Sequence, residues 1–178
     1  MLWVTRSKIR VNRTATAWLV RRFVDPAATF CFVEPPEVAR FQTEHGAIGF
    51  DAPGARYPHR DASGRCSFEA LVEEYRPVDG ALRKLARIVH VADFPDEIGV
   101  RRARGSSPRT NAFDAISLAP RSRAVGTEHD TPAAPEAVGL RAISRGFPLI
   151  TADDHETLER SAFLYDALYT SLQERLAP

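Results

Sequence analysis

A group of basic residues near the N-terminus is the first feature with a clear chemical use. No acidic residue precedes Asp25, and the cations of this stretch are Arg6, Lys8, Arg10, Arg13, Arg21 and Arg22. Arginine offers planar pairs of N–H donors that match oxyanions. A helix that follows such a basic loop adds its own N-terminal N–H groups.

This basic segment therefore predicts anion binding by Arg6, Arg13, Arg21 and Arg22. We expect Arg6 and Arg13 to lie on one concave surface, and their replacement with alanine to weaken anion binding with little loss of stability. The alternative is a solvated basic face whose charges pair with acids elsewhere in the chain.

A loop further along the chain is rich in side chains that bind metals. Between a strand end and a helix start it contains Asp51, His59, Asp61, Cys66 and Glu69. Imidazole, carboxylate and thiolate are the common ligands of transition metals. The spacing matches no strict metal signature. In the alternative interpretation His59 is an exposed loop residue, Glu69 supports the first turn of its helix and Cys66 is a small buried apolar side chain.

Two more carboxylates lie at expected helix ends. Asp93 follows the apolar run 82–92, at the C-terminal end of a helix where the macrodipole disfavours negative charge. It therefore needs a partner, either an arginine or a metal. Glu136 lies in the first turn of another helix, where a glutamate is favourable without any further role.

The elements that must position these side chains fall into two parts. In the N-terminal third, short apolar segments at 2–5, 29–33 and 47–50 indicate strands. Helical spacing from Thr14 indicates a helix between the first two strands, and a second helix runs from Pro35 to Gly46. We expect an α/β fold with a small sheet of three to four strands covered by helices.

The C-terminal two-thirds of the chain is predicted to be mainly helical. Residues 101–134 are rich in Arg, Ser, Pro and Thr and indicate an irregular insertion. The remaining expected elements are helices beginning at Ser67, Asp79, Pro135 and Asp153, the third of them ending near Gly146, and a short strand at 148–151.

Length and composition define the class of protein. With 178 residues and 44% hydrophobic content, the chain is expected to form a single domain, 1–178. A net charge of +1 gives no general attraction to nucleic acid or membranes. The two cysteines form no close pair, and the first residues include no apolar stretch of signal-peptide length. We therefore expect a cytoplasmic protein without a membrane partner.

Several blocks of residues, in order along the chain, form one pattern. Its positions are Trp3, Thr5, Arg6, Arg13, Trp18, Leu19, Arg21–Phe23, Asp25–Pro26, Phe50–Asp51, His59, Cys66–Glu69, Ala92–Asp93, Pro135–Ser144, Asp153–Asp154 and Tyr165–Tyr169. In these positions the chain resembles the chromate-resistance protein family, in its ChrB C-terminal domain. The departures from the family pattern are Thr16-Ala17, where the family has Cys-Pro, and the stretch 9–12, where it has Pro-Lys-x-Asp.

The resemblance implies a part in the response to a toxic oxyanion such as chromate. It also gives weight to four residues that fall inside family blocks, and we expect them to converge on one site. A histidine with several carboxylates suits Zn, Fe or Mn. The expected metal ligands are His59, Glu69, Asp93 and Glu136.

The leading hypothesis is a metal-binding accessory or sensor domain with a basic, anion-attracting N-terminal segment. One alternative is a metal-dependent redox or hydrolytic enzyme, whose metal would keep an open coordination position. Another is a DNA-associated regulator that uses the N-terminal arginines. Near-neutral charge and the lack of a recognisable helix-turn-helix pattern in the sequence argue against DNA binding by this chain.

Overall fold

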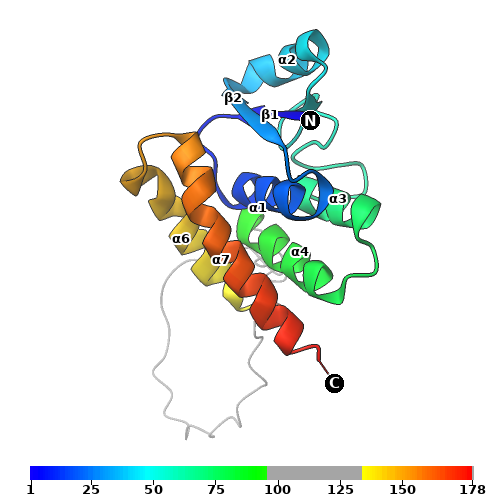
Figure 1. Ribbon diagram of the computed structural model, residues 1–178, viewed down its shortest axis with the longest axis vertical. Helices are drawn as coiled ribbons and strands as arrows, with labels where there is room; N and C mark the ends of the chain where they lie inside the picture. Colours follow the sequence, from blue (N-terminus) through cyan, green and yellow to red (C-terminus); the bar gives the residue numbers. More distant parts are fainter. Residues whose placement is uncertain (96–133, 178) are drawn as a thin grey trace, which may run out of the picture.

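The computed structural model describes residues 1–95 and 134–177, and within them it has a small parallel sheet covered by helices (Figure 1). The expected α/β class, with its sheet in the N-terminal third, is confirmed. The strands run in the order β2-β1-β3, all parallel. The elements are β1 (Leu2–Arg6), α1 (Val11–Leu19), η1 (Val20–Val24), β2 (Thr29–Val33), η2 (Pro35–Glu37), α2 (Val38–His45), β3 (Ile48–Gly49), α3 (Ser67–Tyr75), α4 (Gly80–Asp93), α6 (Glu136–Ile150) and α7 (Asp154–Glu174).

The central strand β1 separates two apolar cores. Successive side chains of a strand point to opposite faces. Trp3 accordingly packs in the larger core with Phe30 and Phe50, and Val4 packs in a smaller core with Val38. As a result α2 covers one face of the sheet, and the remaining helices gather on the other (Figure 1).

Helix α1 lies at the centre of the larger core. It begins at Val11, three residues before the expected start at Thr14, and every one of its residues is buried. It packs against α3, α4 and α7. The Thr14 hydroxyl lies 2.7 Å from the hydroxyl of Tyr165 in α7, so a polar contact fixes α1 against the last helix. The N-terminus of α1 is thereby held at the edge of the sheet.

The prediction of a strand at 148–151 is wrong. Helix α6 does not end near Gly146 but continues through Pro148 to Ile150. A proline in the last turn removes only one backbone hydrogen bond of the helix. The Thr151 hydroxyl then donates to the Phe147 carbonyl at 2.8 Å, which satisfies one of the last free carbonyls.

The expected caps at Asp79 and Asp153 are present, each accepting a hydrogen bond from the N–H three residues on. The predicted irregular insertion lies outside the described residues, apart from Ala134.

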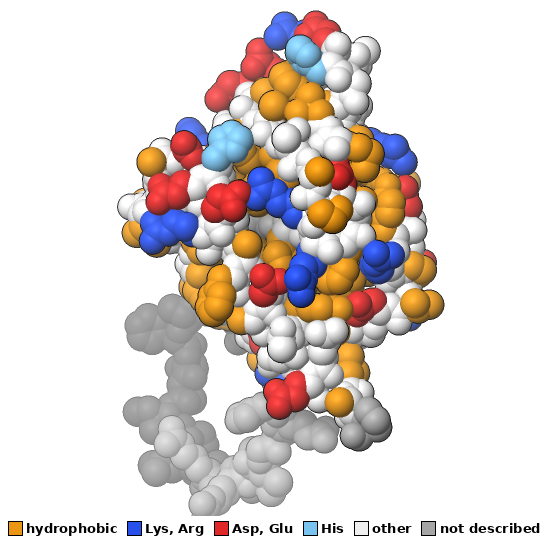
Figure 2. Space-filling model, in the orientation of Figure 1, with side chains coloured by type: hydrophobic (Ala, Val, Ile, Leu, Met, Phe, Trp, Pro, Cys, Tyr) orange, Lys and Arg blue, Asp and Glu red, His pale blue; other side chains and the backbone are white. Residues whose placement is uncertain are grey.

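On the face drawn in Figure 2 basic and acidic side chains are interspersed. Among the described helices, none has the length and apolarity to cross a membrane.

Candidate functional site

A cavity of about 340 Å³ opens at the carboxyl ends of the strands. After β1 the chain turns to α1 on one face of the sheet, and after β2 it turns to α2 on the other. Such a reversal in a parallel sheet creates a crevice where ligands commonly bind. The residues that line the cavity are Arg6, Ser7, Lys8, Arg10, Asn12, Arg13, Pro35, Asp51 and Asp93.

Asp51 organises the polar groups of this cavity. Asp51 is 1% exposed and lies two residues after the end of β3, next to Phe50. Its Oδ1 accepts a hydrogen bond from Asn12 Nδ2 at 2.8 Å and lies 2.6 Å from His59 Nδ1. Its Oδ2 accepts from Arg13 at 2.9 Å and from Arg6 at 3.4 Å. The Arg6 Nε also donates to the Asp51 carbonyl at 2.9 Å.

The charges around Asp51 outweigh the effect of its burial. Burial alone would raise the pKa of this carboxyl group, but the hydrogen bond with His59 and the charge of Arg13 hold the pKa below its ordinary value. Asp51 therefore stays ionised, and it fixes two guanidinium groups and one imidazole in place.

Two backbone positions in the cavity have positive φ angles. Among the described non-glycine residues, only Lys8 (φ 59°) and Asp51 (φ 51°) adopt this conformation. A left-handed backbone is uncommon for such residues and persists only where the surroundings enforce it. Both strained positions lie at this cavity, as is typical of binding sites.

The loop before α1 already holds one carboxylate. Asp154, at the start of α7, accepts hydrogen bonds from the backbone N–H groups of Lys8 and Ile9, both at 2.8 Å. The sequence indicated a basic loop whose backbone N–H groups would attract an anion. Since Asp154 occupies two of these groups, further anions must be attracted mainly by side chains.

Asp93 faces His59 across the inner part of the site. The His59 Nδ1 lies 3.5 Å from Asp93 Oδ2, a buried oxygen that has no hydrogen-bond partner. Burial and the charge of Asp51 raise the pKa of Asp93 to about 6. The hydrogen bond with Asp51 raises the pKa of His59, so its imidazolium form is favoured.

A second cluster lies at the junction of α3 and α4. One ligand atom each from Cys66, Glu69 and His90 falls within 4.8 Å of the others. Glu69 Oε2 accepts from the Cys66 N–H at 2.9 Å and lies 2.6 Å from His90 Nδ1. The Phe94 ring packs against the imidazole of each cluster, with 4.9 Å between its centroid and that of either His59 or His90.

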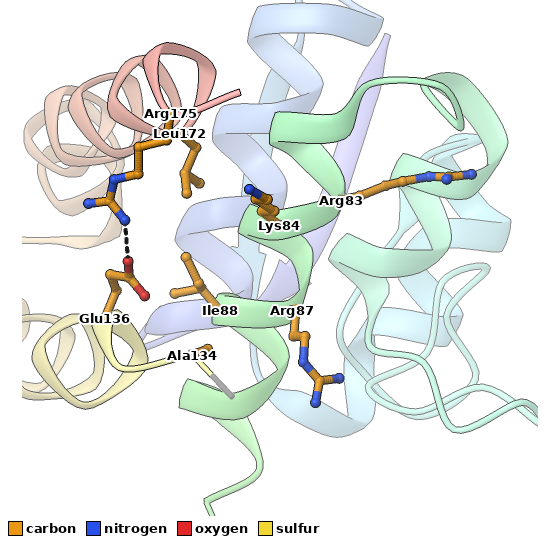
Figure 3. A pocket seen from close by; sticks show the side chains of 8 residues that line it. All are labelled: Arg83, Lys84, Arg87, Ile88, Ala134, Glu136, Leu172 and Arg175. Atoms are coloured by element: carbon orange, nitrogen blue, oxygen red, sulfur yellow. Dashed lines mark hydrogen bonds and ion pairs between the residues drawn. The ribbon is translucent and has the colours of Figure 1, made fainter. Parts of the chain in front are cut away.

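The four residues expected to bind one metal are divided among three places. His59 and Asp93 lie together with Asp51, and Glu69 lies with Cys66 and His90. The structure does not bring Glu136 to either group. It accepts a hydrogen bond from Arg175 at 2.8 Å in another cavity, between α4, α6 and α7 (Figure 3).

The direction of α6 explains the position of Glu136. The part of α6 that meets Asp93 carries Arg141, Ser144 and Arg145. Each residue of an α-helix advances by about 1.5 Å, so Ser144 lies roughly 12 Å along the axis from Glu136. The start of a helix at Pro135 and Glu136 was predicted correctly. The position of Glu136 in the sequence, however, could not show which end of α6 faces Asp93.

The arginines of the N-terminal segment are also divided. Arg6 and Arg13 line the cavity at the carboxyl edge. Arg21 and Arg22 line a different cavity, beside Trp18, where they pair with Glu159 and Asp166 of α7. Eight or nine residues of helix separate Arg13 from these two, which is roughly 12 Å or more along the axis.

Four residues of the two groups were missing from the predicted sites: Asp51, Asn12, Cys66 and His90. Cys66, like Asp51, belongs to the loop that the sequence marked as rich in metal-binding side chains. Asp51 had a usable signal, because an acidic residue directly after a strand falls at the carboxyl edge of a parallel sheet. Asn12 and His90 carried no such signal. Their roles depend on the packing of α1 against α3 and of α3 against α4.

Comparisons with known proteins support the family resemblance for the blocks from Trp3 to Asp93, and the blocks from Pro135 onward lie outside the family match. The family model described as "ChrB, C-terminal domain" matches residues 3–116. Protein ChrB of Cupriavidus metallidurans is 36% identical over 124 residues, which cover 68% of this chain and 33% of that protein. The match thus spans about a third of this curated relative. No solved structure matches the chain. From the extent of the family match, this chain belongs to the family of ChrB C-terminal domains.

Proposed function

We propose that this domain takes part in chromate resistance as a cytoplasmic sensor or accessory domain that binds a small tetrahedral oxyanion. The binding place is the cavity at the carboxyl edge of the sheet. The observation that carries the proposal is the arrangement of Arg6, Arg13 and His59 around the one buried carboxylate of Asp51. Guanidinium groups fixed in this way lose little side-chain entropy when they bind an oxyanion.

The charges of the cavity favour an anion over a cation. Lys8 and Arg10 are exposed and add positive charge to Arg6 and Arg13, while Asp51 and Asp93 are the acids that line the cavity. Asp51 is already surrounded by four hydrogen-bonding side chains. A metal bound to Asp51 would have to displace some of them and lie next to two guanidinium groups.

A metal at the first cluster is the second candidate. One ligand atom each from Asp51, His59 and Asp93 lies within 4.8 Å of the others. This arrangement would also suit a metal-dependent enzyme with an open coordination position. The two candidates differ in the effect of Asp93→Asn, because removing this negative charge strengthens anion binding but weakens metal binding.

Neutralising the exposed cations is the direct test of the oxyanion site. We expect Lys8→Gln and Arg10→Gln each to weaken chromate and sulfate binding by roughly 3- to 10-fold, because each removes one charge near the anion. Isothermal titration calorimetry at two salt concentrations measures the loss, and the remaining affinity should fall as salt rises.

Arg22→Gln is the matched control for these variants, since Arg22 belongs to the same basic segment but lines another cavity. Its affinity for both anions should equal that of the wild-type protein. Equal weakening in all three variants would point to a general charge effect and contradict a site at the carboxyl edge.

Arg13 is not a suitable residue for this test. It is 9% exposed and pairs with the buried Asp51 at 2.9 Å. Truncating one partner of a buried pair costs about 3–5 kcal/mol, because the other charge is left uncompensated. Replacing Arg13 is therefore expected to cost stability. For this residue, the expectation of little loss of stability when Arg6 and Arg13 are replaced together is not supported.

A further inference from the structure

We propose that Cys66, Glu69 and His90 form a binding site for a thiophilic divalent transition metal such as Zn²⁺, separate from the oxyanion cavity. Their ligand atoms lie within 4.8 Å of one another. A thiolate, an imidazole and a carboxylate form a ligand set that suits Zn²⁺. Three protein ligands leave one position of a tetrahedral ion for water.

Two helices packed against each other hold these ligands. Cys66 is the N-cap of α3, and Glu69 lies three positions later in its first turn. His90 comes from the last turn of α4, which packs on α3. The Cys66 side chain is buried, but those of Glu69 and His90 are 24% and 20% exposed. An ion can therefore enter from solvent past Glu69 and His90.

The existing hydrogen bonds need only a small adjustment. Ligand atoms around a tetrahedral Zn²⁺ lie roughly 3–4 Å apart. The contact of 2.6 Å between His90 Nδ1 and Glu69 Oε2 would open by about 1 Å to admit the ion. Glu69 uses Oε2 for its contacts with Cys66 and His90, so Oε1 can bind the metal while Oε2 keeps the hydrogen bond from the Cys66 N–H.

The local charges distinguish this cluster from the one around Asp51. The negative Glu69 carboxylate belongs to this cluster, whereas Arg6 and Arg13 pair with Asp51 in the first cluster. Burial and the charge of Glu69 raise the pKa of the Cys66 thiol, so the thiol is protonated until a metal binds. When the metal binds, the Cys66 thiol releases its proton to solvent and a sulfur–metal bond forms. The thiolate and the Glu69 carboxylate then balance the two positive charges of the ion.

Co²⁺ is the probe for this site, because a thiolate ligand gives it a charge-transfer absorption band. We expect the full chain to bind one equivalent of Co²⁺ with this band. Cys66→Ser should abolish the band and weaken Co²⁺ binding by more than about 100-fold, since loss of a ligand exceeds the 10- to 100-fold effect of a group that only supports one. Serine is a preferred N-cap, so this variant keeps the start of α3.

His90→Gln tests the site without changing Cys66 and should also weaken Co²⁺ binding by more than about 100-fold. Two variants serve as controls: Cys31→Ser, which removes the other cysteine, and His59→Gln, which changes the first cluster. Both should keep the band and the affinity. Excess Zn²⁺ should raise the melting temperature of the wild-type protein but not that of Cys66→Ser.

The proposal is overturned if the wild-type protein shows no thiolate band, or if Cys66→Ser retains it. Loss of Co²⁺ binding in His59→Gln but not in Cys66→Ser would place the ion at the first cluster instead. Sulfate titration of Cys66→Ser distinguishes a failure of the metal site from a failure of the proposed oxyanion site. Sulfate affinity equal to the wild type, together with loss of Co²⁺ binding, is the expected result.

Discussion

Asp51→Asn is expected to lower the free energy of unfolding by about 3–5 kcal/mol. The neutral amide cannot compensate the charges of Arg6 and Arg13, and Arg13 would remain buried without its ionic partner. For a protein of this size, such a loss lowers the melting temperature by roughly 6–20 °C. Urea denaturation at pH 7 measures the free energy, and a thermal scan measures the shift.

Glu159→Gln is the control, because Glu159 also pairs with an arginine but is exposed. Its effect should stay below about 1 kcal/mol. The contribution of Asp51 also depends on pH in a definite direction. Its pKa is lower in the folded protein, so the stabilisation is present at neutral pH and is lost as pH falls below about 4. A loss below 1 kcal/mol in Asp51→Asn would contradict the central role of this carboxylate.

Asp93→Asn is expected to stabilise the protein by about 2–3 kcal/mol at pH 7 to 8, because each unit of a pKa shift corresponds to about 1.4 kcal/mol. Burial and the neighbouring Asp51 raise the pKa of Asp93 from 3.8 to about 6. The folded protein therefore holds this proton more tightly than the unfolded chain does. Wild-type stability should decrease as pH rises from about 4 to 6, and the carboxylate remains destabilising at higher pH.

The asparagine variant should lose this decrease in stability between pH 4 and 6. Urea denaturation of both proteins at intervals from pH 4 to pH 8 measures the free energy of unfolding. The slope of this free energy against pH is then compared between the two proteins. The attraction of His59 opposes the rise in the pKa of Asp93 and is already included in the value of about 6. Identical slopes in the two proteins would show that Asp93 is not held in a raised-pKa state.

The sequence predicted the fold better than it predicted the site. Strands at both ends of the first βαβ unit follow from short apolar segments, and the helix between them follows from apolar residues at helical spacing. The caps at Asp79 and Asp153 could be predicted because their hydrogen bonds reach only three residues along the chain. These features depend on local interactions, which a sequence displays directly.

The grouping of site residues depends on how helices are oriented, which local patterns do not display. Glu69 and Glu136 both lie in the first turn of a helix, and Asp93 ends one. Nothing in their spacing shows that Glu69 pairs with His90 or that Glu136 pairs with Arg175. Arg13 and Arg21 likewise belong to one basic segment but face different cavities because a helix carries them apart.

The carboxylate of Asp154 also has a consequence for the order in which the molecule is assembled. It binds the backbone of Lys8 and Ile9, which precede it by 146 and 145 residues. During synthesis the N-terminal residues leave the ribosome first and the sheet strands soon after. The loop that carries Lys8 can form these two hydrogen bonds only after the start of α7 has emerged. The cavity at the carboxyl edge of the sheet is therefore completed last, although most of the residues that line it are made first.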